Sequence, residues 1–191
     1  KFNVTPGARF AGLEAVTDWK IVPVYWLAIS GLILGTFVDF EHLIIPDRVT
    51  LGGIVAGVIC SALVPSLHNR SEILDSLFWS AVGAATGWLI LWLIATVGKL
   101  IFRQEAMGFG DVKLMGAIGA FLGWKAVLFT VMASSLFGSI AGIALVIMKK
   151  KEMQSRIPYG PYIALAAALW MLWGPQWWRA YLDFMMPVDP Y

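Results

Sequence analysis

The chain has 191 residues, of which 59% are hydrophobic and 14% are charged, and its formal net charge is +2. Soluble domains carry about 25% charged residues, so this composition excludes a soluble enzyme or a nucleic-acid-binding domain. Disorder is excluded as well, because a disordered chain needs low hydrophobicity and high net charge. The composition therefore predicts an all-α integral membrane protein that crosses the bilayer several times.

Charged residues divide the sequence into apolar blocks, and a membrane-spanning helix needs about 20 mostly apolar residues. After a polar arm at residues 1–18, the predicted spans in chain order are 21–38, 49–67, 76–98, a short segment at 114–124, 126–148 and 157–178. The glycines of the short segment would let neighbouring helices approach closely. The sequence thus predicts one membrane domain, residues 19–191, built as a bundle of about six transmembrane helices with the short, glycine-rich one at its centre.

Basic residues predict which side of the membrane each loop occupies, because Lys and Arg are enriched in cytoplasmic loops. The three loops 39–48, 99–113 and 149–156 contain eight Lys and Arg residues, whereas the short loops on the other side contain only Arg70 and Lys125. The first three loops are therefore expected to be cytoplasmic, and the polar arm periplasmic.

Two aspartates stand directly against predicted spans on the cytoplasmic side, where acidic residues are costly and usually functional. Asp39 ends the first span, and Asp111 follows Gly108-Phe109-Gly110 just before the short helix. Glycines permit backbone conformations closed to other residues, so this loop is expected to fold tightly and present Asp111. Two adjacent carboxyl groups can share a proton, so that one activates water while the other protonates the scissile carbonyl. Alternatively, the two aspartates are unrelated helix caps at the interface.

The helix dipole gives a hypothesis about the roles of these two aspartates. Asp39 lies at the C-terminal, negative end of its predicted helix, and Asp111 lies at the N-terminal, positive end of the next. On this argument Asp111 is the base and Asp39 the partner that bears the proton.

Three motifs in this chain resemble those of the bacterial type IV prepilin peptidases. Residues 108–114 read GFGDVKL, a GxGD motif; residues 39–47 read DFEHLIIPD; and residues 157–162 read IPYGPY, similar to the IPFGP motif of that family. GxGD alone also occurs in presenilin-type proteases, so the resemblance rests on all three motifs in the same order, over most of the chain.

The resemblance implies a membrane-embedded aspartic endopeptidase of the bacterial inner membrane. Such an enzyme removes the basic leader from type IV prepilins and type II secretion pseudopilins at the cytoplasmic face. Carried over to this sequence, the catalytic pair is Asp39 and Asp111, and Asp47 is the competitor to Asp39. The residues assigned to substrate binding or loop support are Asp47, Glu105, Gly108, Gly110 and Lys113. The expected partners are a prepilin or pseudopilin substrate and membrane lipid, without nucleic acid.

The sequence also departs from the family pattern. Many bacterial members have a further N-terminal span and a cytoplasmic domain with two CxxC pairs, and they also N-methylate the new N-terminus from S-adenosylmethionine. This chain has a single cysteine, Cys60, so it is expected to be either the C-terminal peptidase part of a longer protein or a compact, peptidase-only relative. The missing CxxC domain favours the first. No metal and no cofactor are expected for peptide cleavage, and S-adenosylmethionine only where the methyltransferase activity is retained.

Two other functions stay open on the sequence. A presenilin-like intramembrane aspartyl protease predicts an aspartate pair at membrane depth and leaves the IPD segment, residues 45–47, unexplained. An ion transporter would use the aspartates to bind cations, and it predicts more polar residues along the long spans than this chain contains.

Overall fold

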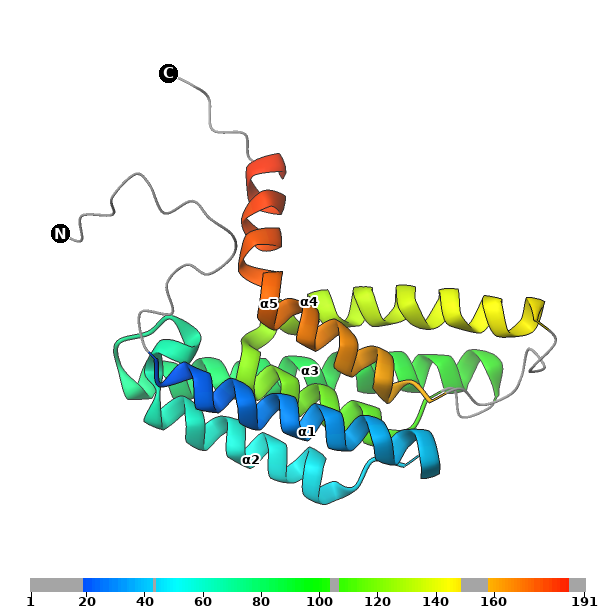
Figure 1. Ribbon diagram of the computed structural model, residues 1–191, viewed down its shortest axis with the longest axis horizontal. Coiled ribbons are helices and arrows are strands. Elements are labelled where there is room, and N and C mark those ends of the chain that lie inside the picture. Colours follow the sequence, from blue (N-terminus) through cyan, green and yellow to red (C-terminus); the bar gives the residue numbers. More distant parts are fainter. Residues whose placement is uncertain (1–18, 43, 104–106, 149–157, 186–191) are drawn as a thin grey trace.

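The structure, a computed structural model, describes residues 19–42, 44–103, 107–148 and 158–185 (Figure 1). These residues form five α-helices and one short 3-10 helix, without any β-strand among them, so the all-α prediction is confirmed. The helices are α1 (Ile21–His42), α2 (Asp47–Leu63), η1 (Pro65–His68), α3 (Ile73–Phe102), α4 (Phe109–Ile147) and α5 (Gly160–Met185).

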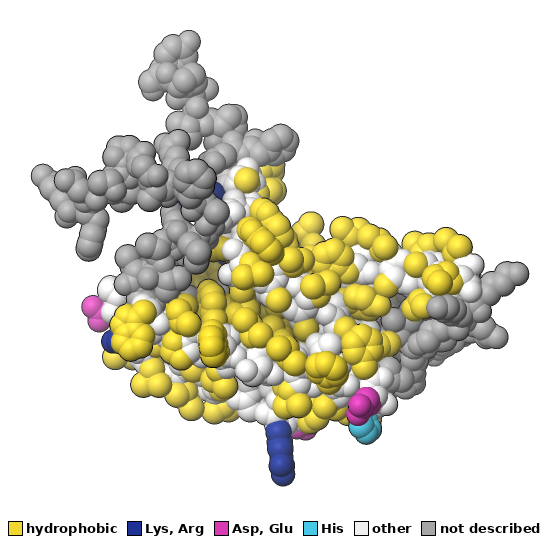
Figure 2. All heavy atoms as spheres, in the orientation of Figure 1, with side chains coloured by type: hydrophobic (Ala, Val, Ile, Leu, Met, Phe, Trp, Pro, Cys, Tyr) yellow, Lys and Arg dark blue, Asp and Glu magenta, His cyan; other side chains and the backbone are white. Residues whose placement is uncertain are grey.

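Three of the described helices are long and apolar enough to cross a membrane: Ile21–His42, Ile73–Ile101 and Phe109–Leu145. The outside of the molecule is also apolar, and Figure 2 shows a face that is mostly hydrophobic. Large side chains such as Trp26 and Leu100 are 72% and 80% exposed. Soluble monomers rarely expose contiguous apolar surface of this extent, so the fold is that of a membrane protein.

The prediction of six spans is wrong in detail. α2 has 17 residues, which is about 25 Å at 1.5 Å per residue and shorter than a hydrocarbon core of about 30 Å. α5 contains Pro175 within a stretch of Gly, Gln and Trp, and it is not one of the three helices that are long and apolar enough to cross. The segments expected at 114–124 and 126–148 both fall within α4.

A non-helical residue, Gly123, divides α4 into two parts, 109–122 and 124–147. Its φ of 80° and ψ of 172° belong to a backbone region that essentially only glycine adopts. Figure 1 shows the chain reversing direction there, so that the light-green first part and the yellow last part lie as separate rods. The sequence predicted a boundary at this place, but set it by the charge of Lys125 rather than by the glycine.

The first part of α4 is the centre of the bundle, as predicted for the glycine-rich segment. Its side chains from Val112 to Phe121 are almost all buried, between α2 and α3. Gly83 of α3 and Gly119 of α4 face each other so closely that a Cβ added to either would run into the backbone carbonyl of the other. These two glycines therefore set the spacing between α3 and α4.

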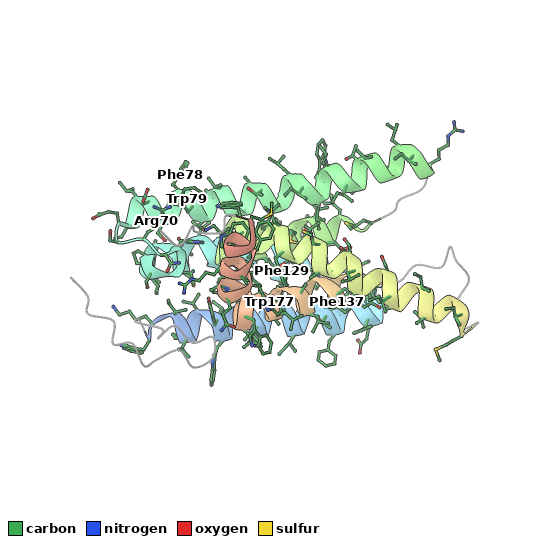
Figure 3. All side chains as sticks on the ribbon, turned by 90° about the horizontal axis from the view of Figure 1, so that it is seen from above. Arg70, Phe78, Trp79, Phe129, Phe137 and Trp177 are labelled. Carbon is green, nitrogen blue, oxygen red and sulfur yellow. The ribbon has the colours of Figure 1, made fainter. Side chains whose placement is uncertain are left out.

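Aromatic rings pack around the start of the second part of α4, away from the helix ends that carry Asp39 and Asp111. Figure 3 shows Phe129 of α4 beside Trp177 of α5, with ring centroids 5.1 Å apart. Lys125 lies 5.1 Å from the centroid of Trp178. Beyond Pro175 the red part of α5 turns away from the other helices (Figure 1), as proline inside a helix commonly causes.

Candidate active site

Asp39 and Asp111 come together at one end of the bundle, called here the dyad end. Asp39 lies in the last turn of α1 and Asp111 in the first turn of α4, 72 positions apart in sequence (111 − 39). They line a common pocket of about 260 Å³ and interact electrostatically. Both side chains are buried, at 5% and 7% exposure. Isolated helix caps at an interface would be solvated, so this arrangement favours a functional pair.

Glycines of the GxGD loop allow Asp111 to reach this position. The backbone N–H of Asp111 donates to the carbonyl of Gly108 at 3.2 Å, which starts α4. Gly110 lies against Ile45, and a Cβ on Gly110 would stand 3.3 Å from the Ile45 backbone nitrogen. The absence of a side chain at Gly110 thus lets the IPD segment pack on the beginning of α4.

Asp39 is held by α5, the last of the described helices. The backbone N–H of Gly160, the first residue of α5, donates to Oδ2 of Asp39 at 3.0 Å. The first amides of a helix have no partner within the helix and carry its positive dipole end, so they favour an anion. Asp39 therefore contacts the N-terminus of α5, and Asp111 lies within the N-terminal turn of α4. The dipole argument made from the sequence counted only α1, and with α5 included it no longer separates the roles of the two aspartates.

Tyr159 fixes the beginning of α5 against α4. Its hydroxyl is within hydrogen-bond distance of Ser134 Oγ at 2.7 Å and Ser135 Oγ at 3.2 Å. Because Gly160 follows directly, these contacts also determine where its N–H points. Sequence reasoning identified the motif at 157–162 only by resemblance and gave it no part in the site. The sequence feature that could have indicated its role is the glycine between Tyr159 and Pro161 at the start of a predicted helix.

Asp47 and Lys113 pair across the mouth of the same pocket. Lys113 Nζ contacts the Asp47 carboxylate and lies 5.3 Å from the centroid of the Phe109 ring. The Asp47 side chain is 63% exposed and the Lys113 side chain 17%. The ion pair joins the start of α2 to the start of α4, and it distinguishes the exposed, paired Asp47 from the buried Asp39.

Ile45 is a structural part of the site that sequence reasoning missed. It is 4% exposed, and its side chain would lie within 3.2 to 3.7 Å of a Cβ at Gly35, Gly110 or Gly160. Three glycines from α1, α4 and α5 thus converge on one isoleucine beside the two aspartates. Of the predicted support residues, Gly108, Gly110, Asp47 and Lys113 all line the pocket, and Glu105 lies outside the described residues.

Comparison with known proteins finds similarity over most of the chain. Residues 26–143 match the type IV leader peptidase family. The protein named prepilin leader peptidase/N-methyltransferase in Aeromonas hydrophila is 36% identical to this chain, over 92% of this chain and 62% of its own length. The protein of that name in Pseudomonas aeruginosa is 35% identical, over 81% of this chain and 50% of its own length. The protein of that name in Legionella pneumophila is 32% identical, over 84% of this chain and 53% of its own length.

This chain therefore spans about half to three fifths of the length of these relatives. No solved structure matches it.

Proposed function

The chain belongs to the type IV leader peptidase family, and we propose that it is a membrane aspartic endopeptidase that removes the leader from type IV prepilins or secretion pseudopilins. The observation that carries this proposal is the pocket at the dyad end, where Asp39 and Asp111 are buried side by side. Two adjacent carboxyl groups that share one proton are the arrangement with which aspartic proteases activate water without a metal.

In the proposed reaction the two carboxyl groups share one proton. The ionised carboxylate takes a proton from a water molecule, whose oxygen attacks the scissile carbonyl carbon, while the protonated carboxyl group gives its proton to the carbonyl oxygen. The tetrahedral intermediate then collapses. Its C–N bond breaks, the leaving nitrogen receives a proton from one carboxyl group, and the other recovers the proton of the intermediate's hydroxyl, which restores the pair.

The surrounding residues orient the two carboxyl groups. The Gly160 N–H occupies Oδ2 of Asp39, which leaves the other oxygen for water or substrate. We assign Asp39 rather than Asp47 to the pair because the Asp47 carboxylate is exposed and already engaged by Lys113. Gly108 and Gly110 act through the backbone, and Lys113 holds the rim of the pocket.

We further propose that the dyad end faces the cytoplasm in a bacterial inner membrane, with the arm 1–18 on the periplasmic side and lipid around the helices. The excess of Lys and Arg in the loops at that end supports this orientation. Peptide cleavage is proposed to need no cofactor. S-adenosylmethionine would be required for the methyl transfer that the names of the relatives include, and we assign no described residue to it.

The position of the aspartates bears on the presenilin-like alternative. Both lie in the terminal turns of their helices, which favours cleavage near the membrane surface over cleavage at membrane depth.

Cleavage of a purified prepilin in detergent or lipid tests the proposal. The wild type is compared with Asp39→Asn, Asp111→Asn and Asp47→Asn. We expect the first two variants to lose activity by about 10²-fold or more, the range of general acid–base catalysis, and the third to retain it. Activity in Asp39→Asn together with loss in Asp47→Asn would move the partner of Asp111 to Asp47. A wild type that leaves the prepilin intact, with cation flux in vesicles, would favour the transporter instead.

A further inference from the structure

A second cavity of about 260 Å³ opens between α1 and α5, and none of the residues assigned to catalysis lines it. We call it the α1–α5 groove. The residues that define it here are Ile29, Ile33 and Phe37 of α1, and Pro161, Ala164 and Ala168 of α5. Figure 2 shows the face that carries α1 and α5, and its surface is mostly hydrophobic.

The groove begins beside the catalytic pocket. Phe37 stands two residues before Asp39, and Pro161 directly follows Gly160, whose N–H donates to Asp39. From Thr36 to Ile29 the lining extends along α1 for seven residue steps, which is about 10 Å at 1.5 Å per residue. The groove therefore lies next to the aspartate pair on both of its helices.

The chemistry of the groove disfavours a polar occupant. Among the residues that the structure describes, no charged side chain lines it, and α1 is one of the candidate membrane spans. Ile33 and Phe37 are 52% and 65% exposed, while small alanines on α5 leave the space in front of them. The groove thus fits an apolar rod at membrane depth, which is either a stretch of polypeptide helix or a lipid chain. Its position next to the aspartate pair along both α1 and α5 favours the polypeptide.

We infer that the α1–α5 groove binds an apolar helical segment of the substrate that follows the scissile bond, an inference that rests on the function proposed above. The leader lies on the exposed side of the dyad, and the apolar segment runs along α1 from Thr36 toward Ile29. The segment then fixes which peptide bond lies between Asp39 and Asp111. The groove is a specificity-determining site.

Disulfide crosslinking tests this placement directly, because Cys60 is the only cysteine of the chain. In a Cys60→Ser, Asp111→Asn background that leaves the substrate uncut, Thr36→Cys and Ile29→Cys are each paired with a type IV prepilin carrying single cysteines along its apolar segment. We expect the best-crosslinked prepilin position to move by about seven residues between the two variants, since two helices lying side by side advance equally. Val55→Cys on α2, 59% exposed, is the control.

Crosslinking that shows no preferred register, or that is equally strong at Val55→Cys, overturns the inference and leaves lipid as the occupant. A kinetic test uses Ala168→Phe, which fills the groove, against Ala85→Phe on the exposed side of α3. We expect about tenfold or greater increase in KM for the membrane-embedded prepilin in Ala168→Phe, with kcat preserved, and no change in Ala85→Phe. Equal KM values in all three enzymes contradict the groove while the peptidase function stands. A wild type that cleaves no prepilin contradicts the function itself.

Discussion

The hydrogen bond from Gly160 to Asp39 joins α5 to α1 at the place where the chemistry is proposed. A Cβ at position 160 would stand 2.7 Å from Oδ2 of Asp39, closer than real contacts of this kind. At the scale of single residues, the position of the Asp39 carboxylate thus depends on a backbone amide, and on Ile45 packed between three glycines.

Gly160→Ala should therefore keep the fold but displace the Asp39 carboxylate. A misplacement of about 1 Å costs on the order of 10²-fold in rate, so we expect kcat for prepilin cleavage to fall by that order with KM little changed. Gly31→Ala in α1, where an added Cβ meets nothing within 4 Å, is the matched control. Equal kcat in the two variants would show that the hydrogen bond does not position Asp39.

The Asp47–Lys113 pair has a different expected signature. An exposed ion pair contributes about 0 to 1 kcal/mol, so Asp47→Asn and Lys113→Met should each reduce cleavage less than tenfold. Because both break the same contact, the double variant should be no worse than the single ones. A double variant whose losses multiply would mean that the two residues act separately.

His68 offers a prediction about pH at the other end of the molecule. Burial lowers the pKa of His68 and nearby Arg70 adds to this, while the hydrogen bond to the carbonyl of Ala120 raises it. The pKa of His68 in the folded protein thus lies below the usual value of about 6.5, which applies to the unfolded chain. Between these two pKa values the unfolded chain binds more protons than the folded one, so the free energy of unfolding falls as the pH drops below about 6.5. The Tm in detergent should decrease over that range, and His68→Gln should flatten the decrease. An unchanged slope in His68→Gln would assign the effect to other groups.

At the scale of helices, α4 decides the architecture, because its first part fills the core and presents Asp111. Sequence reasoning predicted this central, glycine-rich segment from its glycine spacing, and the pairing of Asp39 with the GxGD loop from carboxylates placed directly against apolar spans and from the family motifs. It did not predict that Gly123 divides α4 into two parts, because this glycine acts through its positive φ angle and hydropathy does not report backbone angles. Nor did it predict the contact of Gly160 with Asp39, because a backbone donor has no side chain to recognise.

Gly83→Ala or Gly119→Ala should separate α3 from α4. Each added methyl group meets the backbone of the facing helix, and overpacking of this kind costs about 1–3 kcal/mol. We expect a lower Tm in detergent for both variants. In Gly52→Ala on α2 the added Cβ meets nothing within 4 Å, so its Tm should stay or rise slightly. A Tm in Gly83→Ala equal to the wild-type value would contradict the close approach.

At the scale of the whole molecule, the two ends of the bundle differ in their residues. The dyad end holds the buried carboxylates and the exposed Glu41, and the opposite end holds η1, Asn69 and the aromatic rings around Trp178. The apolar flank between them matches a bilayer, so the orientation of the molecule determines from which side of the membrane the aspartates are reached.

Cysteine labelling checks this orientation in the Cys60→Ser background. With a membrane-impermeant maleimide, Glu41→Cys should react in inverted inner-membrane vesicles and Asn69→Cys in spheroplasts, because the dyad end is proposed to be cytoplasmic. Both positions are exposed. The reverse pattern would place the aspartates in the periplasm and exclude cleavage at the cytoplasmic face.

The contact between Gly160 and Asp39 also has a consequence for biosynthesis. Asp39 in α1 and Asp111 at the start of α4 are both synthesised before the ribosome reaches Gly160, the first residue of α5. Until α5 has been synthesised and has packed against α1, Asp39 lacks its backbone donor and the α1–α5 groove lacks one wall. The two halves of the proposed site, the aspartate pair with its backbone donor and the groove beside it, are thus completed in one step, when α5 packs against α1.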